Sequence, residues 1–124
     1  MSTVLIVEDN EKNMKLARDV LQAKGYKTLE AVTGEDGVRL ARDNVPDLVL
    51  MDIQLPGISG IEAFKQLRAD PKTARIPVVA LTASVTPTDR SAITAAGFDA
   101  FVGKPISLKD FIDTVKRLLE GAKK

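Results

Sequence analysis

The 124-residue sequence contains neither cysteine nor histidine. Without thiols, the chain can form no disulfide and no thiolate metal site. Without imidazoles, it also lacks Ser-His and Cys-His catalytic pairs and the usual nitrogen ligands of zinc. Any chemistry must therefore use carboxylates, hydroxyls, lysines or backbone groups.

An excess of charge of one sign is also missing. Lysine and arginine number 18 and aspartate and glutamate 17, which leaves a formal net charge of +1, and the two signs are interspersed. This balance argues against a nucleic-acid or membrane surface built on bulk charge. No segment resembles a signal peptide or reaches membrane-spanning length. We expect one cytoplasmic domain over residues 1–124 that binds neither nucleic acid nor membranes.

Short apolar runs alternate with helix-like segments, and no linker, repeat or low-complexity stretch interrupts them. Continuous apolar runs at residues 4–7, 48–51 and 78–81 indicate strands buried on both faces of a sheet. The run at 26–31 is more polar and the run at 100–102 is short, so both suit edge strands.

Helix signals lie between these runs. Residues of N-cap type precede each expected helix: Asn10, Thr33, Ser59, Thr86 and Ser107. Gly25 stops the first helix. The alternation predicts the α/β class, with a parallel five-stranded sheet covered by helices on both faces. This is the flavodoxin-like (βα)5 fold, with strand order 2-1-3-4-5.

Polar side chains follow four of the five expected strands. Glu8 and Asp9 follow the first strand, and Asp52 ends the third. Thr82 ends the fourth strand, and Lys104 follows the fifth. The carboxyl ends of parallel strands meet at one edge of the sheet, and these four strands are neighbours in the predicted order. We therefore expect the five residues to form one site.

Three carboxylates at one point would repel one another unless a cation relieved the repulsion. Mg²⁺ favours oxygen ligands and often binds together with a phosphate, and Mn²⁺ can substitute for it. An aspartate beside such an ion can act as a nucleophile and form an aspartyl phosphate. Lys104 can supply positive charge and Thr82 a hydroxyl donor to the phosphoryl oxygens. The residue types fit phosphoryl transfer to Asp52.

Each of these residues also has an ordinary structural interpretation. Asp9 can cap the first helix, Glu8 can be a solvated loop acid, and Asp52 can begin an Asx turn. Thr82 can bond to the backbone, and Lys104 can be a surface lysine. Their joint position at one edge of the sheet is what favours a functional site.

At these residues the chain resembles the receiver domain of two-component response regulators over essentially its whole length. The motifs that carry the resemblance are VLIVEDN at 4–10, LMDIQLPG at 50–57, Gly60, ALTA at 80–83 and Lys104-Pro105. The EDN opening, residues 51–56 and residues 104–106 are most similar to single-domain cell-division response regulators of the DivK type. Receivers of hybrid kinases share these motifs.

The resemblance implies a role in a phosphorelay. A sensor histidine kinase or a histidine phosphotransfer protein would donate a phosphoryl group from phosphohistidine to Asp52. Asp9, Asp52 and the main-chain carbonyl of Gln54 would bind Mg²⁺, and Glu8 would act through water. The protein would be a phosphoacceptor that promotes its own phosphorylation and dephosphorylation, not a turnover enzyme.

The resemblance also implies a conformational switch. Thr82 and Lys104 would contact the phosphoryl oxygens, and a cis bond before Pro105 would pin the lysine backbone. Phosphorylation would draw Thr82 inward and let the ring of Phe101 turn in, which would change what the face of the fourth helix, fifth strand and fifth helix binds. Phe101 can equally be an ordinary core aromatic. The fourth helix, with Ile93 as its only large apolar residue, suits a mobile element or a poorly packed one.

Two positions depart from the commonest receiver pattern. Glu8 precedes Asp9 where two aspartates are usual, which lengthens one arm of the acidic pair and leaves the metal geometry open. Phe101 replaces a tyrosine, so a signal that depends on the hydroxyl is lost. Gln54 and Ser84 flank the expected path of attacking water and are candidates for tuning dephosphorylation, or ordinary solvated loop residues.

The chain stops about where the fifth helix should end, so we expect no output domain. We expect a downstream protein bound in trans, and a monomer or weak homodimer. An aspartyl-nucleophile phosphatase is disfavoured because Gln54 stands where a second aspartate is usual. A flavin-binding protein is disfavoured because the acidic segment Glu8-Asp9-Asn10 would repel a phosphate unless a metal intervened. A pseudo-receiver that never accepts phosphate is disfavoured because all five site residues are present.

Overall fold

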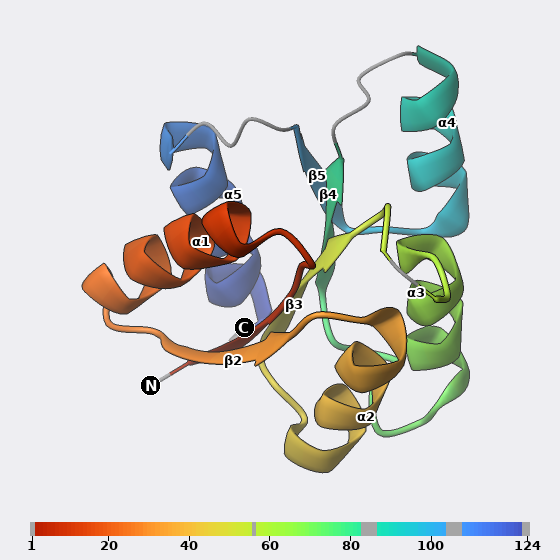
Figure 1. The fold of residues 1–124 in the computed structure, drawn as a ribbon, viewed down its shortest axis with the longest axis horizontal. Coiled ribbons are helices and arrows are strands. Elements are labelled where there is room, and N and C mark those ends of the chain that lie inside the picture. The colour runs from red at the N-terminus through yellow and green to blue at the C-terminus, as the bar shows by residue number, and fades with distance from the viewer. Residues whose placement is uncertain (1, 56, 83–86, 104–107, 123–124) are drawn as a thin grey trace.

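The computed structural model describes residues 2–55, 57–82, 87–103 and 108–122 (Figure 1). Five strands and five helices alternate along them. The strands are β1 (Thr3–Val7), β2 (Lys27–Ala31), β3 (Leu48–Asp52), β4 (Val78–Thr82) and β5 (Ala100–Gly103). The helices are α1 (Glu11–Ala23), α2 (Gly34–Asn44), α3 (Gly60–Ala69), α4 (Pro87–Ala96) and α5 (Leu108–Ala122). This order confirms the predicted (βα)5 pattern.

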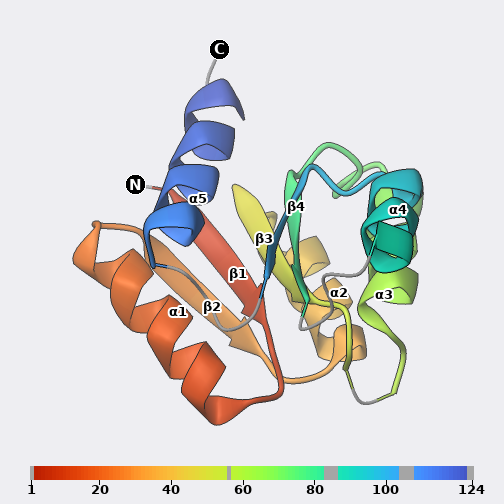
Figure 2. The same ribbon diagram turned by 90° about the horizontal axis from the view of Figure 1, so that it is seen from above.

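The five strands form one parallel sheet in the order β2-β1-β3-β4-β5, as predicted. Helices α1 and α5 cover one face, and α2, α3 and α4 lie on the other (Figures 1 and 2). In the described part of the chain, no helix combines the length and the apolar character that crossing a membrane requires.

The three central strands are buried because they are apolar on both sides. Successive side chains of a strand point to opposite faces of the sheet, so each central strand contributes to two cores. In β1, Val4 and Ile6 pack toward α1 and α5, whereas Leu5 and Val7 pack toward α2 and α3. Strands β2 and β5 are partly exposed, which confirms them as edge strands. The continuous apolar runs thus hold the sheet between two helical layers.

Side-chain caps fix the starts of the first three helices. Asn10, Thr33 and Ser59 each accept the backbone N–H of the residue three positions later, at 3.1, 3.1 and 3.2 Å. These bonds satisfy donors that the first turn of a helix leaves without an intrahelical partner, and they confirm three predicted caps. The other two, Thr86 and Ser107, lie outside the described residues.

Helices α1 and α2 end in left-handed backbone, but with different residues. Gly25, at φ +88°, follows α1 and confirms the predicted stop. Helix α2 instead ends at Val45, at φ +45° and ψ +66°, whose N–H donates to the carbonyl of Ala41 at 2.8 Å. A β-branched side chain is poorly suited to this conformation, and Val45 is 51% exposed, so burial offsets little of the strain.

Several contacts hold together the end of the sheet where β4 begins. One carboxylate oxygen of Asp99 accepts both the Val78 N–H, at 2.7 Å, and an Arg68 N–H, at 2.8 Å. The ring of Phe98 stacks on Phe64 with centroids 4.1 Å apart, and the Arg68 guanidinium lies over Phe64 at 4.6 Å. The connection from α4 to β5 is therefore anchored to α3 at the edge opposite the carboxyl ends of the strands.

We predict that Val45→Asn raises the free energy of unfolding by about 1 kcal/mol, because asparagine tolerates left-handed backbone better than valine does. Urea unfolding would measure the gain, and thermal unfolding would show a Tm higher by a few degrees. Val32→Asn is the matched control. Val32 is 55% exposed, and Val45 is the only non-glycine residue with positive φ in the described ranges. Equal changes in both variants would contradict the assignment of strain to Val45.

Candidate functional site

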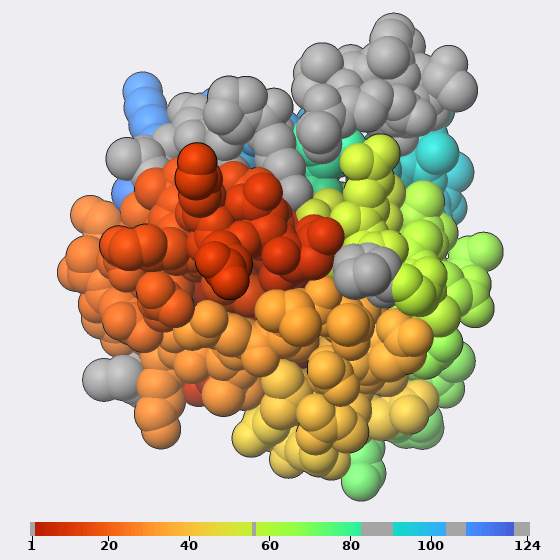
Figure 3. Space-filling model, viewed as in Figure 1, coloured from red at the N-terminus to blue at the C-terminus, as the bar shows by residue number. Residues whose placement is uncertain are grey.

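The carboxyl ends of β1 and β3 bring three carboxylates together. Glu8, Asp9 and Asp52 each place a carboxylate oxygen within 4.8 Å of the others. They meet because β1 and β3 are paired, with Val7 opposite Met51, so the residues that follow emerge side by side. The β1–α1 segment, in red, and the β3–α3 segment, in yellow-green, adjoin on the face shown in Figure 3.

Two of the three acids are buried. Glu8 is 1% and Asp52 3% exposed, whereas Asp9 is exposed. The burial of Glu8 is incompatible with its alternative reading as a solvated loop acid. The alternative reading of Asp9 as a helix cap is also wrong, because Asn10 caps α1. Both acids therefore lack the ordinary structural explanation that the sequence had left open for them.

The main chain fixes the carboxylate of Asp52. The N–H of Gln54 donates to Asp52 Oδ1 at 3.0 Å, which is the hydrogen bond of an Asx turn. The sequence offered the Asx turn and the acidic cluster as alternatives for Asp52. In the structure Asp52 takes part in both. The side chain of Gln54 is exposed.

The backbone of Gly60, the first residue of α3, lies against the end of β3. Its N–H donates to the carbonyl of Ile53 at 2.9 Å, and the N–H of Ile53 donates to the carbonyl of Leu81 at 3.0 Å. A Cβ at Gly60 would overlap the carbonyl oxygen of Asp52 and lie 2.7 Å from Ile53 Cα. Only glycine allows this approach, so Gly60 helps to determine where Asp52 sits.

The remaining predicted site residues are only partly described. Thr82 is 5% exposed and ends β4, one residue beyond the pairing of Asp52 with Leu81. Phe101 is half-buried in β5. The others lie outside the described residues: Ser84, Lys104 and Pro105.

A hollow of about 430 Å³ extends from the acidic cluster along α1 toward the end of β2. Its lining includes Glu8, Asp9, Lys15, Arg18 and Glu30. Two of the three acids, Glu8 and Asp9, thus line a hollow on the side where α1 faces β2.

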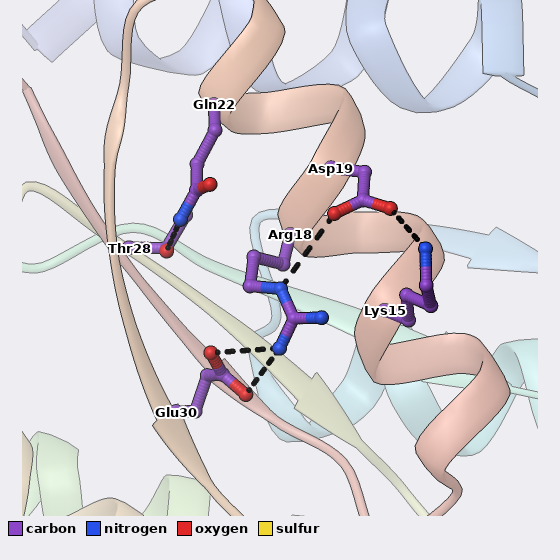
Figure 4. Close-up of polar contacts among 6 residues, drawn as sticks. All are labelled: Lys15, Arg18, Asp19, Gln22, Thr28 and Glu30. Atoms are coloured by element: carbon purple, nitrogen blue, oxygen red, sulfur yellow. Dashed lines mark hydrogen bonds and ion pairs between the residues drawn. The ribbon is translucent and has the colours of Figure 1, made fainter.

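Charged side chains of α1 and β2 border this hollow. Arg18 bridges α1 to β2 by binding both carboxylate oxygens of Glu30, each at 3.2 Å (Figure 4). Lys15 donates to Asp19 at 2.8 Å. The Lys15 hydrogen bond lowers the pKa of Asp19 from its usual value, with smaller contributions from the charges of Lys15 and Arg18.

Residues 4–116 match the sequence profile of the response regulator receiver domain. The chain belongs to the receiver family. It is 48% identical over 120 residues to the polar-differentiation response regulator DivK of Brucella ovis, and the match covers 97% of this chain and 98% of that protein. The same identity and coverage hold for DivK of Brucella anthropi. This receiver is thus of the DivK cell-cycle type of two-component signalling, as the motifs predicted.

Solved structures agree with this assignment. A response regulator from Chloroflexus aurantiacus matches the receiver with a TM-score of 0.91 and 31% identity, over 96% of this chain and 98% of that one. The receiver domain of a sensor histidine kinase from Pseudomonas aeruginosa matches with a TM-score of 0.89 and 30% identity, over the same shares of the two chains. That domain was solved with a magnesium ion coordinated in its active-site cleft. The family assignment argues against the flavin-binding and phosphatase alternatives.

We predict that Asp52→Asn raises the free energy of unfolding by about 1–3 kcal/mol when a chelator removes divalent ions, because it deletes one of three clustered charges. The Gln54 N–H keeps its acceptor in this variant. Urea unfolding would measure the effect, and millimolar Mg²⁺ should shrink it. Asp43→Asn removes an exposed acid of α2 outside the cluster and should change little. A lower free energy of unfolding for Asp52→Asn would contradict repulsion among the three acids.

We predict that Gly60→Ala lowers the free energy of unfolding by about 1–3 kcal/mol, because the added methyl group meets the backbone of Asp52 and Ile53. The direction of the change is diagnostic, because replacing an unobstructed helical glycine by alanine raises the free energy of unfolding by about 1 kcal/mol. Urea unfolding measures the change. An unchanged or higher free energy of unfolding would show that Gly60 is not held against Asp52.

Proposed function

We propose that Asp52 accepts a phosphoryl group from a phosphohistidine of a sensor histidine kinase or a histidine phosphotransfer protein. The observation that carries the proposal is the cluster of Glu8, Asp9 and Asp52, whose carboxylate oxygens lie within 4.8 Å of one another at the carboxyl edge of the sheet. Membership of the receiver family supports the same role.

The residues present at this edge fit a divalent cation. Carboxylate oxygens are the ligands that Mg²⁺ and Mn²⁺ favour. A bound cation would also relieve the repulsion among three carboxylates that lie close together and are partly buried. Asp9, Asp52 and the main-chain carbonyl of Gln54 would hold Mg²⁺, with Glu8 acting through water. When bound, Mg²⁺ would offset the negative charge of the carboxylates and of the phosphoryl group.

The transfer needs a positioned nucleophile and donors to the phosphoryl oxygens. A carboxylate oxygen of Asp52 attacks phosphorus while the bond from phosphorus to the histidine nitrogen breaks, and the imidazole leaves with the electron pair of that bond. The Gln54 N–H at Oδ1 orients the carboxylate. The Thr82 hydroxyl and the Lys104 ammonium donate to the phosphoryl oxygens. No general base is required, because a carboxylate oxygen attacks without losing a proton.

The product carries a phosphoryl group beside β4, and this change is read by another protein. Thr82 moves toward the phosphoryl group, and the half-buried ring of Phe101 turns in on the neighbouring strand. The surface of α4, β5 and α5 then binds a downstream protein in trans. Gln54 and Ser84 tune the rate at which water removes the phosphoryl group.

The receiver acts in this scheme as a cytoplasmic phosphoacceptor, not as a turnover enzyme on a separate substrate. It needs neither nucleic acid nor a membrane, and it works as a monomer or a weak homodimer. The cis bond before Pro105 would hold the backbone of Lys104 at the site.

We predict that incubation with acetyl phosphate and Mg²⁺ adds one phosphoryl group to the wild-type protein, and that peptide mapping by mass spectrometry locates it at Asp52. Asp52→Asn should gain no mass, because the amide is not a nucleophile. A chelator should abolish the gain in the wild-type protein. Asp43→Asn, the exposed control on α2, should be labelled like the wild type.

Two results would overturn the proposed function. A wild-type protein that gains no mass with Mg²⁺ present would be a pseudo-receiver. Equal labelling of the wild-type and Asp52→Asn proteins would place the phosphoryl group on another residue.

A further inference from the structure

A neutral side chain of α1 binds Glu8, one of the two buried acids of the cluster. The amide Nδ2 of Asn13 donates to Glu8 Oε1 at 2.8 Å. The backbone N–H of the same residue donates to the capping oxygen of Asn10 at 3.1 Å. Asn13 is therefore tied to the start of α1 through its main chain and to the end of β1 through its side chain.

Glu8 is the residue whose geometry most needs such a restraint. A glutamate has one more rotatable bond than the aspartate usual at this position, and fixing a side chain of this kind costs about 1–2 kcal/mol of conformational entropy. A short hydrogen bond to one oxygen selects one orientation of the carboxylate before any ion binds. Glu8 is 1% exposed and the bond is partly buried, so water competes with it less than at an exposed site.

We propose that Asn13 is a positioning residue that orients the Glu8 carboxylate toward Asp9 and Asp52 and thereby raises the affinity of the cluster for a divalent cation. The inference rests on the proposed function, because it presumes that the three acids bind a cation. It assigns to Asn13 a role that acts through Glu8 and not through direct contact with the ion.

The chemistry of an amide suits this position better than its alternatives. An amide N–H donates to a carboxylate without adding charge, so it leaves the attraction of the cluster for a cation intact. A lysine or arginine would compete with the cation. An aspartate would bring a fourth carboxylate and no donor. Lys15, which lines the same hollow as Glu8, is bound to Asp19 at 2.8 Å.

Isothermal titration of the full chain with MgCl₂ would test the proposal. We predict that Asn13→Ala raises the Kd for Mg²⁺ about tenfold, in line with the loss of other hydrogen bonds to metal-binding side chains. The cap of α1 survives, since the alanine keeps the backbone N–H that Asn10 accepts. If Asn13→Ala does not fold, Asn13→Ser, one bond shorter, carries the same expectation.

The same helix offers a matched control in Gln22. Its amide Nε2 donates to the hydroxyl of Thr28 at 2.9 Å, so Gln22→Ala also removes an amide hydrogen bond between α1 and the neighbouring segment (Figure 4). Gln22 is exposed and does not line the hollow beside the acids. Gln22→Ala should bind Mg²⁺ like the wild type.

A double-mutant cycle separates positioning from a general effect on the fold. If Asn13 acts through Glu8, Asn13→Ala should raise the Kd in the wild-type background and leave it unchanged in a Glu8→Ala background. An equal rise in both backgrounds would overturn the proposal, and so would a wild-type Kd in Asn13→Ala. Failure of the wild-type protein to bind Mg²⁺ would instead refute the metal site of the proposed function, so the two failures are distinguishable.

Discussion

The parallel pairing of β1 with β3 is the constraint on which the site depends. Val7 lies opposite Met51, so Glu8 and Asp52 leave the sheet as neighbours and Asp9 joins them at the rim. A slip of one residue in this register would turn every side chain of one strand to the other face and remove Asp52 from the cluster. The register holds because each strand contributes alternate apolar side chains to two cores, and a slip would disturb both. Packing far from the acids therefore fixes where the acids meet.

Two of the donors to the acidic cluster add no charge. The backbone N–H of Gln54 orients Asp52, and the amide of Asn13 orients Glu8. Gly60 lets the start of α3 approach the end of β3, which leaves the carbonyl of Asp52 little freedom to shift. Neutral donors and close backbone packing fix the carboxylates while preserving their negative charge. Such an arrangement suits the cation site proposed for the cluster.

The two ends of the strands lie in different surroundings. At the edge where β4 begins, Asp99 binds both Arg68 and the backbone of Val78, and Phe98 stacks on Phe64. At the carboxyl edge lie the acids, Thr82 and an open hollow. The contacts where β4 begins anchor the connection that leads into β5. The start of β5 is therefore held in place at the end of the sheet opposite the acids.

The sequence by itself determined the order of strands and helices, the strand order of the sheet, three of the helix caps and the meeting of three acids. Each follows from a local pattern combined with general rules of parallel sheets. Only the tertiary structure decided that Asn13 binds Glu8 and that Arg68 pairs with Asp99. Glu8 and Asn13 are five residues apart across a strand-to-helix turn, a spacing that neither the strand nor the helix period brings together. Arg68 and Asp99 are 31 positions apart and meet only after α3 packs on the sheet. Such contacts depend on the angle at which elements pack, and no local sequence pattern encodes that angle.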